Sequence, residues 1–200
     1  PKKIGLISHA EDFDPQFFNI SPREARLMDP QQRKSLELAW MAIENAGYNP
    51  KALSNQQIGV FWGYHSDDYK ELAVSKKTTI DHLMTTSLTP YMIANRISST
   101  LNITGPSETI NTACSSSLVA LHQAVQALRN NHCSQALVGG INLILSQTLF
   151  LSAFESKLLS PTDACRPLDI AADGFVRSEG GAALLLKPLD MALKNHDHIY

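Results

Sequence analysis

Cys114 is the residue in this sequence best placed to do chemistry, because it lies between a short predicted strand, 109–112, and the helix that follows. At the start of a helix, unpaired backbone amides and the positive end of the helix dipole favour the nucleophilic thiolate form of a cysteine. The small residues Ser115, Ser116 and Ser117 come next, and their amides could hold a developing oxyanion. This arrangement suits acyl transfer to a thiol. From position alone, a buried core cysteine is an equally good explanation, because free cysteine is among the most buried side chains.

The other cysteines and the histidines offer weaker candidates. Cys133 and Cys165 neither open a helix after a small-residue turn nor form a CxxC pair, so both are predicted to be ordinary. His122 lies eight residues beyond Cys114 on the same predicted helix. That separation is about 12 Å along the helix axis, too far for a general base, so His122 is interpreted as a core or interface residue. His196 and His198 have no third metal ligand nearby, which favours a surface turn over a metal site.

The segments that must position Cys114 alternate between helical and strand patterns. The clearest helix begins after a capping Asp29, with Pro30 in its first turn, and stops at Gly47. The remaining predictions are a buried strand over 58–63, a surface loop or short helix over 64–86, a helix over 91–101, a helix from Cys114 to about 130, a strand over 136–145, an irregular segment over 156–181, a strand over 182–187, a short helix after Pro188 and the start of a strand at Ile199.

Helical spacing also predicts which faces are apolar. In the first long helix Leu36, Trp40 and Ile43 form one inward stripe. In the helix after Cys114, Leu118 and Leu121 begin a second continuous apolar face that runs on through 125 and 128. The alternation of strands and helices, with no low-complexity linker, predicts one layered α/β domain over residues 1–200.

Composition narrows the class of protein. The 200 residues carry a formal charge of −2 with 44% hydrophobic and 18% charged residues, so the chain can bury a core and has no basic patch for nucleic acid. Two charge-free windows, 109–128 and 135–154, contain too many polar residues to span a membrane and are interpreted as the buried centre of a soluble domain. Three widely spaced cysteines and no recognisable targeting signal favour a reducing, cytoplasmic setting.

A family resemblance strengthens the interpretation of Cys114. The segment GPSETINTACSSSLVALHQA resembles the active-site segment of β-ketoacyl synthases, the condensing enzymes of polyketide and fatty-acid assembly. FDPQFFNISPREARLMDPQQRKSLELAWMAIENAG and LSPTDACRPLDIAADGFVRSEGGAALLLKPLDMAL are similar to the segments upstream and downstream of the nucleophile, especially in modular type I polyketide synthases. The resemblance runs from Phe13 to Tyr200 and is weakest between His65 and Thr86.

The resemblance implies a thiolase-like layered αβαβα fold, of which this chain supplies most of the N-terminal half and the beginning of the second half. The chain is then an internal fragment, a partial ketosynthase domain that is inactive alone. Cys114 would be the acyl-thioester nucleophile, and its backbone amide part of the oxyanion hole. The implied partners are acyl carrier protein, neighbouring polyketide synthase domains and a second copy in a homodimer that pairs through residues 109–113. No cofactor or metal is implied.

Two of the chain's departures from the family pattern bear on the chemistry. The family uses two downstream histidines for decarboxylation, and neither of their motifs occurs in these 200 residues. Asn111 stands where many relatives carry aspartate, which either eases thiolate formation or reflects subfamily drift. Three alternatives stay open: a non-elongating ketosynthase that only transfers acyl groups, an inactive dimer-partner or chain-length subunit, and a thiolase acting on coenzyme A esters. Retention of Cys114 argues against the inactive subunit.

Overall fold

The computed structural model describes residues 3–76 and 81–200. Its central sheet is mixed and has four strands. The strand order is β2-β1-β3-β4, with β1 parallel to β2 and β3, and β4 antiparallel to β3. The elements are α1 (Pro22–Leu27), α2 (Pro30–Asn45), the 3-10 helix η1 (Pro50–Leu53), β1 (Ile58–Gly63), α3 (Asp68–Ser75), α4 (Met84–Ser87), α5 (Met92–Leu101), β2 (Ser107–Ile110), α6 (Ser116–Arg129), β3 (Gln135–Asn142), α7 (Thr148–Glu155), β4 (Gly180–Leu186) and α8 (Leu189–Lys194).

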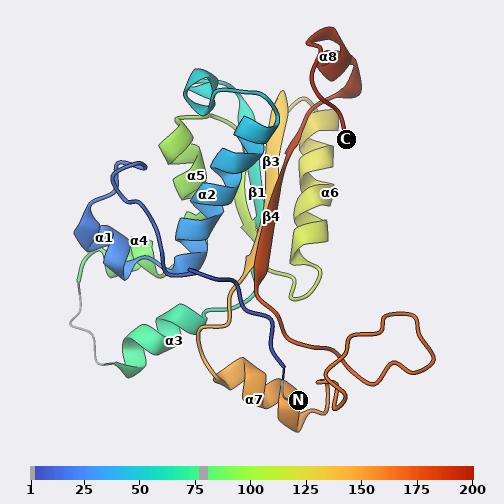
Figure 1. Ribbon diagram of the computed structural model, residues 1–200. Coiled ribbons are helices and arrows are strands. Elements are labelled where there is room, and N and C mark those ends of the chain that lie inside the picture. Colours follow the sequence, from blue (N-terminus) through green and yellow to red (C-terminus); the bar gives the residue numbers. More distant parts are fainter. Residues whose placement is uncertain (1–2, 77–80) are drawn as a thin grey trace.

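Helices cover both faces of the sheet. Figure 1 shows α2 and α5 on one side and α6 on the other. Strand β1 is buried along its whole length, as its continuous apolar sequence predicts. Its side chains alternate between the two layers: Trp62 packs in the core under α2 and α5, and Phe61 packs in the core under α6.

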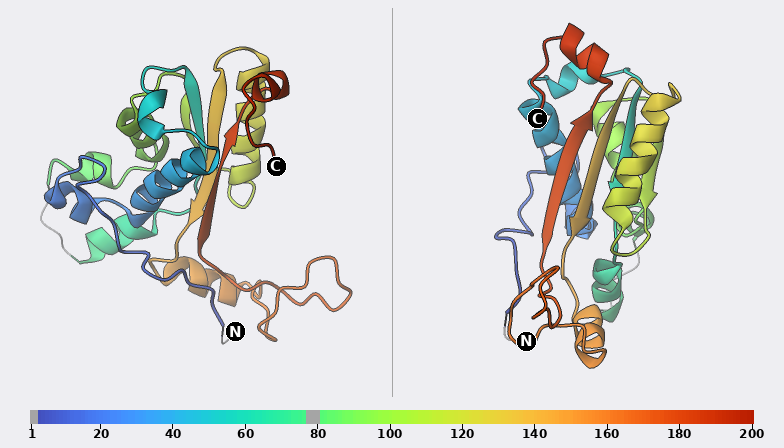
Figure 2. Two further views of the ribbon diagram at one scale, coloured as in Figure 1. Left: turned by 45° about the horizontal axis from the view of Figure 1, so that its top comes forward. Right: turned by 90° about the vertical axis from the view of Figure 1, so that its right-hand side faces the viewer.

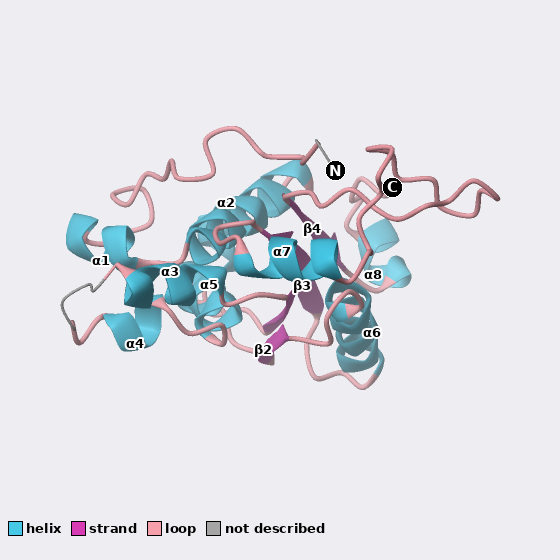
Figure 3. Cartoon of the chain, turned by 90° about the horizontal axis from the view of Figure 1, so that it is seen from below, coloured by secondary structure: helices cyan, strands magenta, loops and turns pink. Residues whose placement is uncertain are grey.

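The carboxyl ends of β1, β2 and β3 meet at one edge of the sheet, because these strands are parallel. Helix α6 begins at this edge, and α7 lies across it when the molecule is seen from below (Figure 3). The segment between α7 and β4 extends away from the rest of the chain (Figure 2). Crevices at the carboxyl ends of parallel strands are where open α/β sheets bind ligands.

Many predicted elements are present. Asp29 caps α2 through a hydrogen bond from the Gln31 amide (2.8 Å), and the predicted helices near 92–101 and 116–129 and the predicted strand over 58–63 are confirmed. Strand β2 lies about two residues earlier than predicted. Helices α1 and α7 were not predicted. The loop or short helix predicted over 64–86 contains α3 and the start of α4, and residues 77–80 lie outside the described part of the chain.

Three predictions fail, the second and third of them only in part. Ile199 starts no strand; the last residues are irregular, and the hydroxyl of Tyr200 donates to Asn45. His122 is exposed, so its interpretation as a core residue is wrong, and an interface role stays a prediction. In α6, alanines face the sheet while Leu118 is 70% exposed.

The two charge-free windows are only partly buried. Strand β3 is central, but the turn before α6 is exposed, and so is much of α7. None of the helices in the described part of the chain is long and apolar enough to cross a membrane.

Candidate functional site

Cys114 is exposed in the turn of residues 111–115 that joins β2 to α6. Ala113 has a φ of 56°, in the left-handed region that is unfavourable for alanine. Hydrogen bonds hold the turn in this shape: Asn111 Oδ1 accepts from the Ala113 amide (3.1 Å), and the hydroxyl of Ser115 donates to the Thr112 carbonyl (2.8 Å). The thiol therefore stands on a tightly hydrogen-bonded turn at the start of a 14-residue helix.

Ser116 attaches this turn to the end of β1. Its hydroxyl accepts a hydrogen bond from the Thr112 amide (2.9 Å) and lies 3.0 Å from the carbonyl oxygen of Tyr64. The approach is possible because Gly63 has no side chain; a Cβ there would lie 2.7 Å from the amide nitrogen of Ser117. Close packing of α6 on the end of β1 thus fixes the position of the turn.

Two of the amides that sequence reasoning offered to an oxyanion are already engaged. The Ser116 amide donates to the Ala113 carbonyl (3.1 Å), and the Ser115 amide makes a longer bond to the Thr112 carbonyl (3.4 Å). The oxyanion role of the Cys114 amide stays a prediction.

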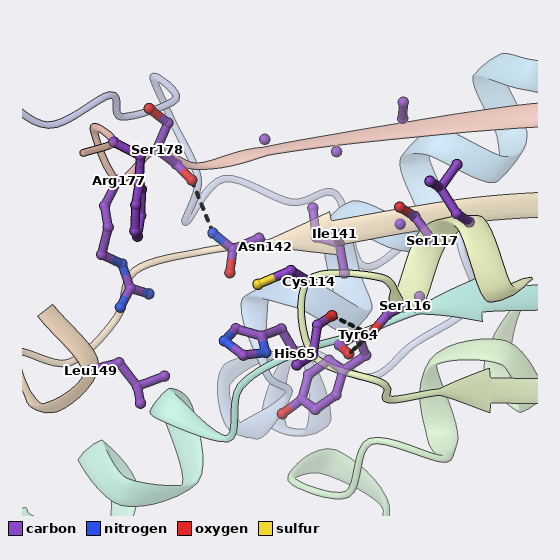
Figure 4. A pocket seen from close by; sticks show the side chains of 18 of the residues that line it. Tyr64, His65, Cys114, Ser116, Ser117, Ile141, Asn142, Leu149, Arg177 and Ser178 are labelled. Carbon is purple, nitrogen blue, oxygen red and sulfur yellow. Dashed lines mark hydrogen bonds between the residues drawn. The ribbon is translucent and has the colours of Figure 1, made fainter. Parts of the chain in front are cut away.

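A cavity of about 1010 Å³ opens beside Cys114. It lies between the carboxyl ends of β1 and β3, the start of α6, helix α7 and the start of β4. In Figure 4 the side chains of Cys114 and His65 point toward the same open space, which Leu149 and Arg177 border on the far side. Asn142 closes another side and donates to the Ser178 carbonyl (2.9 Å). The lining is mainly apolar, which suits a hydrophobic acyl chain.

His65 and Asn142 were not singled out by sequence reasoning. His65 follows the carboxyl end of β1 and Asn142 is the last residue of β3, and the sheet order brings these two strand ends beside Cys114. Strand order depends on pairing between distant segments, so the local sequence pattern did not reveal it.

The remaining candidates lie elsewhere. Cys133 is 4% exposed, and burial raises the pKa of its thiol, which disfavours a reactive thiolate. Cys165 is exposed in the segment between α7 and β4. His196 and His198 are exposed at the C-terminal end, with His196 in a turn. No group of three or more potential metal-ligating side chains occurs within residues 3–76 and 81–200.

The sequence model of the family described as "Beta-ketoacyl synthase, N-terminal domain" matches residues 1–192. The chain belongs to the β-ketoacyl synthase family. Among curated relatives of this β-ketoacyl synthase chain, the cyclo-acetoacetyl-L-tryptophan synthase of Aspergillus oryzae is 47% identical over 94% of the chain and 5% of its own length. The polyketide synthase PksN of Bacillus subtilis is 43% identical over 98% of the chain and 4% of its own length.

Solved ketosynthase structures share the fold. The ketosynthase from module 6 of the bacillaene synthase of Bacillus subtilis 168 superposes with a TM-score of 0.89 at 42% identity, covering 100% of this chain and 34% of that one. An oxazolomycin ketosynthase domain from Streptomyces albus JA3453 gives a TM-score of 0.89 at 36% identity, covering 98% of this chain and 34% of that one. The thiolase-like α/β fold is therefore confirmed. The β-ketoacyl synthase chain spans about a third of these ketosynthase chains and 4% to 11% of the curated relatives.

Proposed function

We propose that this chain is the N-terminal part of a polyketide synthase ketosynthase domain that elongates an acyl chain, with Cys114 as its nucleophile. The observation that carries the proposal is the exposed thiol of Cys114 on a hydrogen-bonded turn at the start of α6, facing a mainly apolar cavity. Membership of the β-ketoacyl synthase family supports the reaction class.

The first step is acyl transfer from a carrier protein to Cys114. The thiolate of Cys114 attacks the carbonyl carbon of the acyl thioester, and the carbonyl electrons move to oxygen, where backbone amides stabilise the oxyanion. When this intermediate collapses, the bond from the carbonyl carbon to the carrier sulfur breaks. The carrier thiolate leaves and takes a proton, so the acyl group remains on Cys114 as a thioester.

The second step is condensation. A malonyl-type extender on a carrier protein loses carbon dioxide, and the electron pair of the broken carbon–carbon bond becomes an enolate. The enolate carbon attacks the carbonyl of the acyl-Cys114 thioester, and collapse expels the Cys114 thiolate. The product is a β-ketoacyl group on the carrier, two backbone carbons longer, and no redox change occurs. Residues beyond this chain assist the decarboxylation, since the family's two histidine motifs do not occur in it.

The protein context is also part of the proposal. We infer that the acyl chains arrive on acyl carrier protein, that neighbouring polyketide synthase domains flank the ketosynthase, and that the protein is cytoplasmic. A homodimer is supported by the sheet order, because β2 pairs with β1 alone among the described strands and forms one end of the sheet. An unpaired strand edge is a template for pairing with a second copy. No resident cofactor or metal is required by the two steps.

The test compares Cys114→Ser with Cys165→Ser in the complete protein that contains this chain. Cys165 is the matched control because its thiol is also free and exposed but is not among the residues that line the cavity. Each protein is incubated with acyl-loaded and malonyl-loaded carrier proteins, and mass spectrometry follows acylation of the peptide containing residue 114 and carbon dioxide release. We expect Cys114→Ser to lose acyl-thioester formation and condensation, and Cys165→Ser to keep both.

The other outcomes assign the alternatives. Wild-type protein that accepts the acyl group on Cys114 but forms no condensation product is a non-elongating ketosynthase. Wild-type protein that is never acylated contradicts the catalytic proposal and leaves an inactive partner subunit. Efficient acylation by coenzyme A esters with no reaction from carrier-bound substrates identifies a thiolase.

A further inference from the structure

The side chain of Asn111 connects the two loops that border the cavity at Cys114. Its Oδ1 accepts a hydrogen bond from the Ala113 amide (3.1 Å), within the turn that carries the thiol. Its Nδ2 donates to the carbonyl oxygen of His65 (3.2 Å), in the loop that follows β1. The two loops are 46 residues apart in sequence, so Asn111 makes a long-range contact at the site as well as a local one.

The turn needs this local hydrogen bond. Alanine with a φ of 56° is unfavourable by about 1 kcal/mol or more, and the backbone keeps such a conformation only where its surroundings impose it. An asparagine side chain that accepts from the amide two residues later makes an Asx turn, which stabilises this kind of local backbone shape. Since Cys114 directly follows Ala113, the direction of its thiol depends on the turn.

The long-range hydrogen bond sets the turn against the cavity wall. The side chains of Ser116 and Asn111 both reach carbonyl oxygens of the loop after β1, at Tyr64 and His65 respectively. Ser116 holds the buried side of the turn, and Asn111 holds its exposed side. Together they prevent the turn from pivoting on the end of β1.

Only an amide side chain of this length satisfies both partners. A carboxylate at residue 111 could accept from the Ala113 amide, but it has no proton to donate to the His65 carbonyl. It would also place a negative charge three residues from a thiolate, which disfavours that thiolate. A serine is too short to reach both loops.

We propose that Asn111 is a positioning residue for Cys114: its carboxamide fixes the left-handed turn and holds the thiol in register with the loop of His65, while adding no charge. This inference rests on the proposed function, in which Cys114 attacks the acyl thioester. It explains the asparagine at this place by its hydrogen-bonding capacity.

The experiment uses the complete protein with three substitutions. Asn111→Ala removes both hydrogen bonds without adding charge, and Asn111→Asp keeps the acceptor, removes the donor and adds charge. The matched control is Asn55→Ala, because Asn55 also has a positive φ (64°) and accepts a side-chain hydrogen bond (from Asn102, 3.2 Å). Asn55 precedes β1 and therefore lies at the opposite end of that strand from Cys114.

Three measurements separate positioning from general damage. The first is hydrogen exchange of peptides covering 107–121, which we expect to quicken in Asn111→Ala and to stay at the wild-type rate in Asn55→Ala. The second is acyl loading, where we expect Asn111→Ala to lower kcat about ten-fold with KM unchanged, because a misplaced nucleophile loses rate rather than substrate affinity. The third is alkylation of Cys114 by iodoacetamide at pH 7.5, which we expect to be slowed about three-fold in Asn111→Asp and to be nearly unchanged in Asn111→Ala.

Wild-type exchange over 107–121 in both Asn111 variants would overturn the inference, whatever the acyl-loading result. Equal losses of loading in Asn111→Ala and Asn55→Ala would also overturn it, because the effect would then reflect stability alone. If Asn111→Ala does not fold, Asn111→Ser replaces it; because the serine keeps an acceptor near the Ala113 amide and loses the contact with His65, we expect a smaller loss of acyl loading and a smaller rise in exchange. Wild-type protein that is never acylated would contradict the proposed function, while the exchange comparison would still decide the role of Asn111.

Discussion

Substituting Gly63 with alanine tests whether close packing of α6 on β1 positions Cys114. A Cβ at residue 63 would lie 2.7 Å from the amide nitrogen of Ser117 and 2.8 Å from its Cα. Ordinary van der Waals contact begins at 3.4 Å, so the first turn of α6 must move away by about 0.7 Å. The obstacle is backbone rather than the end of a flexible side chain, and a side-chain rotation therefore cannot relieve it.

The displacement has two consequences of different size. Overpacking of this kind costs about 1–3 kcal/mol of stability. The same shift lengthens the contact between the Ser116 hydroxyl and the Tyr64 carbonyl, now 3.0 Å, and carries the turn of Cys114 with it. Because a 1 Å misplacement of a reacting group can cost about 100-fold in rate, we expect acyl loading of Gly63→Ala to fall between about ten-fold and 100-fold.

The assay measures acylation of Cys114 and hydrogen exchange of α6 in the complete protein. Gly180→Ala is the steric control, because a Cβ at residue 180 meets no atom within 4 Å and should leave the exchange of α6 unchanged. Faster exchange limited to the start of α6, together with slower loading, is the expected result. If Gly63→Ala loaded acyl groups at the wild-type rate, the claim that this contact positions Cys114 would be refuted.

Three further predictions concern stability. Burial raises the pKa of Asp29 to about 6, so the contribution of Asp29 to stability is fully present below about pH 4 and is lost as the pH rises through 6. Through Asp29, the wild-type protein should therefore lose on the order of 2–3 kcal/mol of its free energy of unfolding between pH 4 and pH 7.5. Denaturation at both pH values should show that Asp29→Asn, which keeps the capping oxygen, lacks this part of the loss. The Lys187 ammonium lies 2.7 Å from the Asp197 carboxylate, and the Lys187 side chain is 8% exposed. Lys187→Met should therefore lower the melting temperature more than Lys194→Met, in which the replaced lysine is an exposed control on α8. Equal effects of the two substitutions would contradict a stabilising ion pair. The isolated 200 residues should aggregate, because Leu118 and other large apolar side chains are exposed. Leu118→Lys should improve the solubility of this isolated chain. A sharp cooperative melting transition without aggregation would contradict the prediction.

Local signals predicted the elements with strong punctuation or a continuous apolar sequence. Asp29 and Pro30 mark the start of α2, and the apolar run of β1 is buried on both faces. The position of Cys114 between a strand and a helix was predicted as well, because small residues after a strand signal a turn. These features depend on a few neighbouring residues, so the sequence alone suffices to predict them.

Long-range pairing explains what the sequence did not predict. The neighbours of Cys114 in the cavity, among them His65 and Arg177, come from segments before and after it, and β1 separates β2 from β3 in the sheet. Tyr200 follows a strand-like pattern, yet its hydroxyl bonds to the end of α2 instead. Contacts of this kind are absent from any short sequence window.

Helix α6 shows why leucine spacing predicted its buried face only in part. The side facing the sheet carries Ala120 and Ala124, both 0% exposed, and a Cβ at Gly140 would already lie 3.0 Å from the Ser117 side chain. Larger residues on this side would push α6 away from the sheet, and the turn of Cys114 would move with the helix. The inner face is therefore small because the helix approaches the sheet closely, while Leu121 and Leu128 are partly buried against the same core and Leu118 is exposed. A spacing rule that assigns large apolar side chains to the core misses the alanines of a helix face that packs this closely on the sheet.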